Sequence, residues 1–258
     1  VSSLIAMSIL VAGLTFGPKH IPVAQRTTGD PELAGHLAQH APKGAHNLAA
    51  AIVDSNGAVK FAGLGADENT EFEIGSVSKT FTAELIRQAV TLDTTVGEIL
   101  DDADMSTSDI TLKELATHTS GLPRILGISA FAVAISMQRK QNPYDGFTTQ
   151  RILDEARTAT LADRGTYNYS NFGMALLGHL LARRAGTTYA QLAQERIFTP
   201  LGMSNTYVMT PETTPANAPR GLDITGHPTA VWDDEGYGPA GGIRSTAADM
   251  TRFMKHLL

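Results

Sequence analysis

Two short apolar runs early in the chain are separated by a polar turn. They cover Ala45 to Val53 and Ala58 to Leu64, with Asp54-Ser55-Asn56-Gly57 between them. Asn-Gly between two such runs is a strong hairpin signal, because both residues tolerate the positive φ that a tight turn requires. The pattern therefore predicts two paired strands in the sheet of an α/β lobe.

Helical periodicity begins at Ser76. Val77, Phe81, Leu85 and Ala89 follow at helical spacing. This spacing predicts a helix that starts at Ser76 and buries the face formed by these apolar side chains. We expect that face to lie between two lobes of the protein.

Nearly all the signals from about residue 96 to residue 203 are helical. Thr111-x-x-Glu114 forms a capping box at the start of one helix, and Gly186 is placed to end a longer one. This segment is therefore expected to form an all-α lobe. Beyond it, Thr246 is expected to cap the last helix of the chain.

The first 44 residues are organised differently. Residues 1–17 are apolar, with no charge before Lys19, and this length is at the short limit for a membrane span. No basic residue precedes the run and no convincing cleavage site follows it, although a signal peptide needs both. We interpret it as the end of an uncleaved membrane anchor, with a cleaved signal or a buried helix as alternatives. Residues 18–44 are expected to form a linker and a connector helix of about residues 31–39.

Composition limits the classes of protein to consider. The chain has 258 residues, of which 42% are apolar, enough for one large domain or two closely packed lobes. Charged residues make up 18%, the net charge is −6 and no basic run occurs, which argues against nucleic acid as a partner. The absence of cysteine excludes disulfides and thiolate metal sites.

Two short patterns could suggest a metal or a cofactor. His36 and His40 are spaced for one helix face, but no H-E-x-x-H motif accompanies them. Gly63-Leu64-Gly65 lacks the remaining glycine spacing of a dinucleotide-binding loop and is interpreted as a strand end. We therefore expect neither a metal nor a cofactor.

The chemistry of the chain is concentrated in Ser76-Val77-Ser78-Lys79 and Tyr169-Ser170-Asn171. A serine three residues before a lysine shares one face of a helical turn with it. Serine is a weak nucleophile at its ordinary pKa and needs such a neighbour. The tyrosine offers a second acid/base group, and the asparagine offers a side-chain amide. The S-x-x-K arrangement is that of penicillin-binding proteins and serine β-lactamases.

The stretch Phe72 to Phe81 resembles the nucleophile region of the class C β-lactamase-like serine hydrolases. That family includes D-Ala-D-Ala carboxypeptidases, class C β-lactamases and related esterases. Further segments similar to the family are residues 117–123, 167–173, 200–203 and 239–245. The resemblance implies a β-lactamase/transpeptidase-like fold over residues 45–258, an α/β lobe plus the all-α lobe at about 96–203.

The resemblance also implies a role for each motif residue. Ser76 would be the acylated nucleophile, and its backbone N–H would form half of an oxyanion hole. Lys79 would activate Ser76 or hold its proton. Tyr169 would be the second acid/base group, the competing interpretation being a buried aromatic at a loop–helix junction. Asn171 would bind the substrate's amide. The implied enzyme is a serine hydrolase that acylates itself on a D-Ala-D-Ala peptide, a β-lactam or an ester.

Two features depart from the family pattern. The third motif, Lys-Thr-Gly or His-x-Gly on a central strand, is not found before Leu258, and the predicted nucleophile helix runs almost directly into residues 91–95. We therefore expect an incomplete sheet and an unpartnered apolar face on the Ser76 helix. A C-terminal continuation or a partner chain would have to supply the third motif. The alternative function is a non-catalytic cell-wall-binding or regulatory protein, or a truncated remnant of the enzyme.

Overall fold

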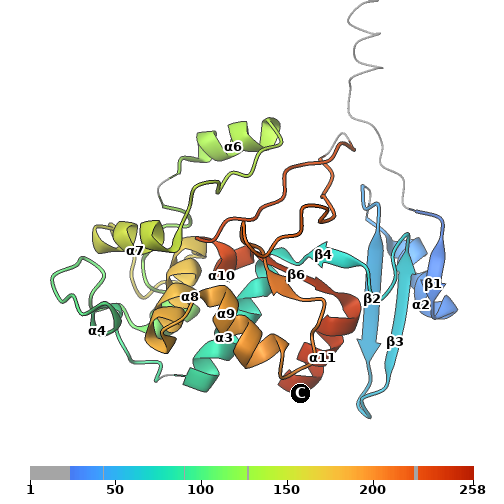
Figure 1. Cartoon of the computed structure of the whole chain (residues 1–258), viewed down its shortest axis with the longest axis horizontal. Helices are drawn as coiled ribbons and strands as arrows, with labels where there is room; N and C mark the ends of the chain where they lie inside the picture. Colours follow the sequence, from blue (N-terminus) through green and yellow to red (C-terminus); the bar gives the residue numbers. More distant parts are fainter. Residues whose placement is uncertain (1–23, 43, 90, 127, 224–225) are drawn as a thin grey trace, which may run out of the picture. The chain divides into compact units, whose positions relative to one another are not determined.

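The computed structural model describes residues 24–42, 44–89, 91–126, 128–223 and 226–258 (Figure 1). The apolar segment 1–17 lies outside the described residues, so its interpretation stays a prediction. The chain divides into two compact units. One contains the chain up to Thr70 together with Arg220–Ala230, and the other contains Glu71–Pro219 together with Val231–Leu258.

The first unit contains an antiparallel sheet with the strand order β1-β3-β2. The predicted hairpin is confirmed, because Leu48 pairs with Leu64 and Val53 with Val59. Asp54 closes its turn by accepting the Ala58 N–H at 2.8 Å. The elements of this unit are β1 (Thr27–Gly29), α2 (Pro31–His40), β2 (Leu48–Val53) and β3 (Val59–Leu64).

One part of the expected linker proved to be a strand. Thr27–Gly29 forms β1, which pairs with the β3 segment from Ala62 to Leu64. A run of only three residues carries no detectable alternation of apolar and polar side chains, so its pairing with β3 decides its conformation. The connector helix formed as expected, with Asp30 as its N-cap.

The second unit contains a sheet that the sequence did not reveal. Its antiparallel order is β4-β6-β5, formed by β4 (Glu71–Glu73), β6 (Ile243–Thr246) and β5 (Tyr207–Val208). All four residues of β6 are buried. A strand buried on both faces lacks the period-2 pattern that makes a strand recognisable. The residue pattern therefore predicts no strand in this segment.

Between residues 96 and 203 the regular elements of the second unit are helices, and the Thr111 capping box and the Gly186 terminus are both present. The last helix groups with these helices in the second unit and not with the hairpin. The helices are α3 (Ser78–Ala89), α4 (Val96–Leu100), α5 (Leu112–Ala116), α6 (Ala130–Gln138), α7 (Thr149–Arg157), α8 (Asn171–Ala185), α9 (Tyr189–Ala193), the π-helix η2 (Gln194–Phe198), α10 (Gly238–Gly241) and α11 (Ala247–Leu257).

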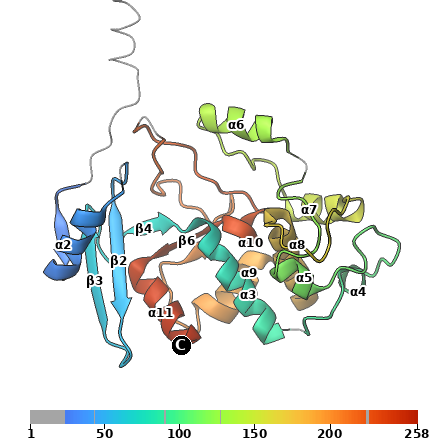
Figure 2. The ribbon, with the colours of Figure 1, turned by 180° about the vertical axis from the view of Figure 1, so that it is seen from behind.

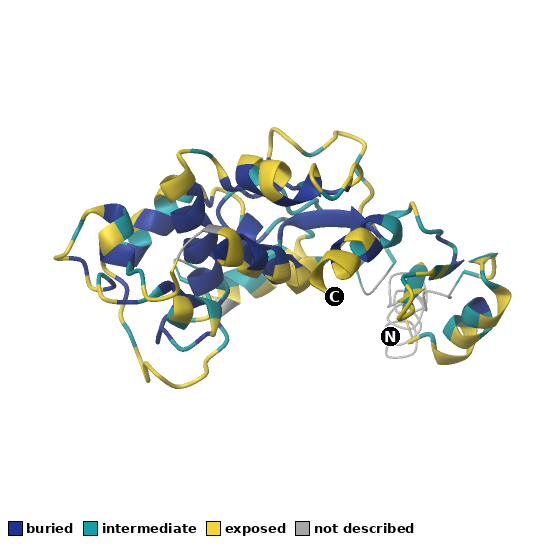
Figure 3. Cartoon of the chain, turned by 90° about the horizontal axis from the view of Figure 1, so that it is seen from below, coloured by how far each residue is buried: buried dark blue, intermediate teal, exposed yellow. Residues whose placement is uncertain are grey.

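α8 is the central helix of this unit. Every residue from Phe172 to Ala182 is buried, and Figure 3 colours buried residues of the chain dark blue. A helix that is apolar all round belongs in the core. Gly178 lets α10 approach α8 closely, because a Cβ there would lie 2.3 Å from the Pro239 side chain. This close approach brings α10 to the site described below.

The apolar face of α3 has partners, so the expectation that it lacks them is wrong. Phe81 stacks on Phe253 of α11 with ring centroids 4.0 Å apart and meets the edge of Phe198. Figure 2 shows α3 beside α9 and α11. The prediction for Val77 is also wrong, because its side chain is 46% exposed. Gly75–Val77 form a 3₁₀ turn before α3, and this turn rotates Val77 off the buried stripe.

Within the described residues, no helix combines the length and apolar character needed to cross a membrane.

Candidate active site

The turn that carries Ser76 is held on both sides by strand β6. Ile74 donates its N–H to the Ile243 carbonyl at 3.0 Å, and Ser78 Oγ accepts the Ile243 N–H at 3.1 Å. Gly75 has φ +52°, a conformation that favours glycine. Ser76 itself is exposed. The turn therefore presents the Ser76 hydroxyl to solvent on a fixed backbone.

Three side chains converge at this hydroxyl. Ser76 Oγ lies 2.8 Å from Tyr169 Oη, and Lys79 Nζ donates to Ser76 Oγ at 3.1 Å. Lys79 Nζ also lies 4.9 Å from the centroid of the Tyr169 ring. The sequence placed Ser76 beside Lys79, and the structure brings Tyr169 to both.

Lys79 is almost completely buried, with 8% of its surface exposed. Its ammonium donates to the carbonyl oxygen of Ala240 in α10 as well as to Ser76. Burial lowers the pKa of Lys79, because it penalises the charged form, and the nearby Arg124 charge lowers it further. Interactions with Tyr169 act in the opposite direction. The net effect favours release of the ammonium proton relative to an exposed lysine.

Tyr169 lies in the segment that leads into α8, whose N-cap is Ser170. Burial acts to raise the pKa of the Tyr169 phenol. Hydrogen bonds with Lys79 and Ser76, together with the charges of Lys79 and Arg124, outweigh burial, so the pKa is lowered overall. The Arg124 guanidinium is 5.0 Å from the centroid of the Tyr169 ring. Lys79 and Tyr169 thus both have lowered pKa values, in direct contact with one hydroxyl.

His118 contacts the Tyr169 ring and holds the backbone on either side of it. Its ring centroid is 4.6 Å from that of Tyr169, and its Nδ1 accepts the Ser170 N–H at 3.2 Å. The His118 carbonyl accepts the Asn168 N–H at 2.8 Å. Burial, followed by the Lys79 charge, lowers the pKa of His118. A neutral imidazole with Nδ1 as acceptor suits this role, because the ring then carries no charge that would compete with Lys79.

Asn171 is the first residue of α8, and its backbone N–H donates to the Arg124 carbonyl at 2.9 Å. Its side-chain Oδ1 is buried and has no hydrogen-bond partner among the described residues. A buried acceptor without a donor is unfavourable by about 1–3 kcal/mol. This atom is therefore available to a donor that enters the site.

Sequence reasoning assigned no role to three residues of this site: His118, Arg124 and Ala240. His118 and Ala240 lie in segments that resemble the family, but their spacing to Ser76 carries no information. Arg124 follows one such segment directly. Only the folded chain shows that its charge faces Tyr169. Among the described residues no group of three or more His, Cys, Asp or Glu side chains could hold a metal ion.

The helical segment, the short sheets and the Ser76–Lys79–Tyr169 cluster together define a β-lactamase/transpeptidase-like fold. The β-lactamase family model matches residues 34–258, and the chain belongs to that family. The match starts before Ala45, where the resemblance was expected to begin, and therefore includes part of α2.

Three proteins illustrate the similarity. A β-lactamase from Lysobacter lactamgenus is 26% identical over 93% of this chain and 63% of its own length. The crystal structure of a class C β-lactamase from Rhodobacter sphaeroides superposes with a TM-score of 0.67 at 27% identity, covering 86% of this chain and 62% of that one. A D-alanine carboxypeptidase from Burkholderia cenocepacia gives a TM-score of 0.62 at 27% identity, covering 86% and 61%. The chain therefore spans less than two thirds of the length of each.

Proposed function

We propose that this protein is a serine hydrolase in which Ser76 attacks a carbonyl carbon and forms an acyl-enzyme. The observation that carries the proposal is the contact of one exposed hydroxyl with two proton-transfer groups, at 2.8 Å to Tyr169 and 3.1 Å to Lys79. Both distances lie within the range needed for proton transfer. A lone serine has no such partners.

The proposed reaction has two steps. As Ser76 Oγ bonds to the carbonyl carbon, its proton passes to the Lys79–Tyr169 pair, and Tyr169 delivers a proton to the leaving group as its bond to carbon breaks. Water then attacks the acyl carbon, the same pair removes its proton, and Ser76 recovers one on release. Burial of Lys79 and the hydrogen bonds to Tyr169 bring their pKa values down, which favours both as proton acceptors.

We propose that Asn171 Oδ1 accepts a hydrogen bond from an amide N–H of the substrate. The buried and unpartnered state of this atom supports the role. A β-lactam with an acylamino side chain and a peptidoglycan peptide ending in D-Ala-D-Ala both carry such an N–H, whereas a simple ester does not. These small-molecule or peptide substrates are therefore favoured over esters.

The proposed substrates place the protein outside the cytoplasm, either secreted or attached to a membrane through residues 1–17. A second oxyanion donor and a contact for the substrate carboxylate would come from a C-terminal continuation or a partner chain.

Covalent labelling tests the nucleophile directly. The protein is incubated with a fluorescent penicillin and, separately, with a fluorophosphonate probe, and the labelled peptide is identified by mass spectrometry. We expect the adduct on Ser76 and no adduct in Ser76→Ala. Ser204→Ala is the matched control, because Ser204 is an exposed serine outside the site. Equal labelling of Ser76→Ala and the parent would show that the assignment is wrong.

Hydrolysis of the same penicillin, measured separately, distinguishes an enzyme from the alternative function. Release of the hydrolysed product with Ser76-dependent turnover supports the hydrolase. Stable labelling without product release, together with no release of D-alanine from a D-Ala-D-Ala peptide, would favour the non-catalytic, wall-binding or regulatory protein.

A further inference from the structure

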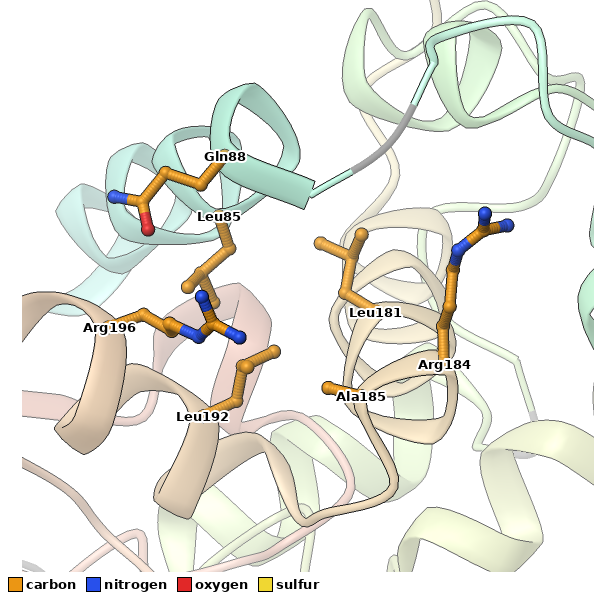
Figure 4. A pocket seen from close by; sticks show the side chains of 7 residues that line it. All are labelled: Leu85, Gln88, Leu181, Arg184, Ala185, Leu192 and Arg196. Carbon is orange, nitrogen blue, oxygen red and sulfur yellow. The ribbon is translucent and has the colours of Figure 1, made fainter.

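A cavity lies at the C-terminal ends of α3 and α8, the two helices whose first turns carry catalytic-site residues. Its volume is ≈ 260 Å³. Its walls come from the last turns of α3 and α8 and from the α9–η2 segment (Figure 4). Ser78, Lys79 and Asn171 belong to the first turns of α3 and α8. We call the cavity the two-arginine pocket, after Arg184 and Arg196.

The floor of the two-arginine pocket is apolar. Leu85, Leu181 and Leu192 line it and are 1%, 2% and 4% exposed. Ligand pockets usually have about 300–1,000 Å³, so this cavity is slightly smaller than that range. It therefore suits the body of a small molecule with a short hydrocarbon chain.

The rim of the pocket is positively charged. Arg184 and Arg196 are exposed, and neither forms an ion pair with a carboxylate in the part of the chain that the structure describes. The carboxylate of Glu84 in α3 is already engaged by Arg87 and His256. In Figure 4 the Arg196 side chain extends across the floor toward Leu85, whereas the Arg184 side chain lies beyond Leu181 and points away from Arg196. Two uncompensated guanidinium groups beside an apolar floor are complementary to an anion with an apolar body.

The backbone that carries Arg196 is unusual. Arg196 lies in the π-helix η2, where the Thr199 N–H donates to the Gln194 carbonyl at 2.9 Å. π-turns are rare in proteins and occur frequently at functional sites. An α-helical continuation would orient the Arg196 side chain differently around the axis, because successive residues rotate by a larger angle in an α-helix. The wide turn therefore contributes to the placement of Arg196 over the floor.

We propose that the two-arginine pocket binds a small amphipathic anion, a monocarboxylate with a short alkyl chain. The carboxylate pairs with Arg196, the chain lies on the three leucines, and Arg184 adds positive charge at the end of α8. Such a ligand bridges the C-terminal ends of α3 and α8. The inference is independent of the proposed hydrolase function, because no lining residue belongs to the catalytic cluster.

Isothermal titration with a series from butanoate to octanoate tests the chemical class. We expect saturable binding of one carboxylate per chain that strengthens by about fourfold for each methylene buried on the floor. Raising the salt concentration should weaken the binding. Absence of saturable binding, no gain with chain length, or equally tight binding of inorganic phosphate would overturn the proposal.

Variants test the location. Arg196→Gln should weaken octanoate binding by about tenfold, and Arg184→Gln should weaken it in the same direction. Arg183→Gln is the matched control, because Arg183 is an exposed arginine in the same last turn of α8 but does not line the pocket. Parent-like octanoate binding in Arg196→Gln, or equal losses in Arg196→Gln and Arg183→Gln, would place the ligand elsewhere.

Discussion

Ser76, Lys79 and Tyr169 each depend on a neighbour for their reactivity. The hydroxyl needs a proton acceptor, the ammonium needs burial to release its proton, and the phenol needs nearby positive charge. The structure supplies all three within one cluster, with Lys79 only 8% exposed. Arg124 adds further positive charge near the phenol, because its guanidinium lies 5.0 Å from the Tyr169 ring centroid.

Arg124→Gln should shift the pH dependence of the proposed hydrolysis. The Arg124 charge lowers the pKa values of both Lys79 and Tyr169. Removing a positive charge stabilises the protonated forms and so raises both pKa values. The limb of kcat/KM that rises with pH should therefore move to higher pH. The measurement is a pH profile with a chromogenic β-lactam, with Arg183→Gln as the control for loss of a surface charge. A limb that stays in place or moves to lower pH would contradict the role of Arg124.

At the scale of elements, the nucleophile helix is fixed at both ends by different interactions. Strand β6 holds the turn before α3, through hydrogen bonds to Ile74 and Ser78. Near the other end, the buried Glu84 accepts a hydrogen bond from Arg87 at 2.6 Å and contacts His256 Nε2 in α11 at 2.8 Å. The hydrogen bond from Arg87 is the main cause that lowers the pKa of Glu84, to about 2.

Glu84→Gln should destabilise the protein at neutral pH and remove part of its acid sensitivity. A carboxyl group with a lowered pKa in the folded state stabilises the fold at pH values above its unfolded pKa, about 4.3. This contribution is lost as the pH falls from there toward 2. We expect a loss of about 1–3 kcal/mol in the free energy of unfolding at pH 7, and a smaller difference between parent and variant at pH 3.

Urea unfolding at the two pH values measures this effect. Glu195→Gln, a change at an exposed carboxylate in η2, should leave the free energy of unfolding near that of the parent. A difference between parent and Glu84→Gln that is as large at pH 3 as at pH 7 would show that the ionised carboxylate is not the stabilising group.

At the scale of the whole molecule, long-range contacts hold the unit that carries the catalytic cluster. Ser76 and Tyr169 meet although they are 93 positions apart in the sequence. Arg244 of β6, only 1% exposed, pairs with Glu71 and Glu73 of β4, and it also donates to the Pro219 carbonyl. The buried Arg244 guanidinium thus connects β6, β4 and the segment at Pro219. Of these, β4 is the strand that precedes the nucleophile turn.

Arg244→Met should be destabilising, by about 1–3 kcal/mol, because Glu71, Glu73 and the Pro219 carbonyl all lose the donor that Arg244 provides. The measurement is chemical denaturation of the full chain at pH 7. Arg183→Met is the control for the same substitution at an exposed position. A stability within about 0.5 kcal/mol of the parent would show that the Arg244 network does not hold β4 on β6.

The sequence by itself determined those features whose interactions are local. The hairpin turn at Asp54, the capping box at Thr111, the terminus at Gly186 and the spacing of Ser76 and Lys79 all depend on residues at most four positions apart. Caps and turns act through neighbouring backbone groups, so their residue types can be read without knowing the fold. The motifs also predicted the family to which the chain belongs.

Only the tertiary structure decided the rest. The β4-β6-β5 sheet pairs β6 with β4, more than 170 positions away, and with β5, at least 35 positions away, and two or three residues carry too little pattern to predict their pairing. The burial of Lys79 against Ala240, the position of His118 behind Tyr169 and the free acceptor on Asn171 arise where α3, α8 and α10 pack together. Reactivity here follows from desolvation and from charges brought close in space, and neither quantity is encoded in the order of residues near Ser76.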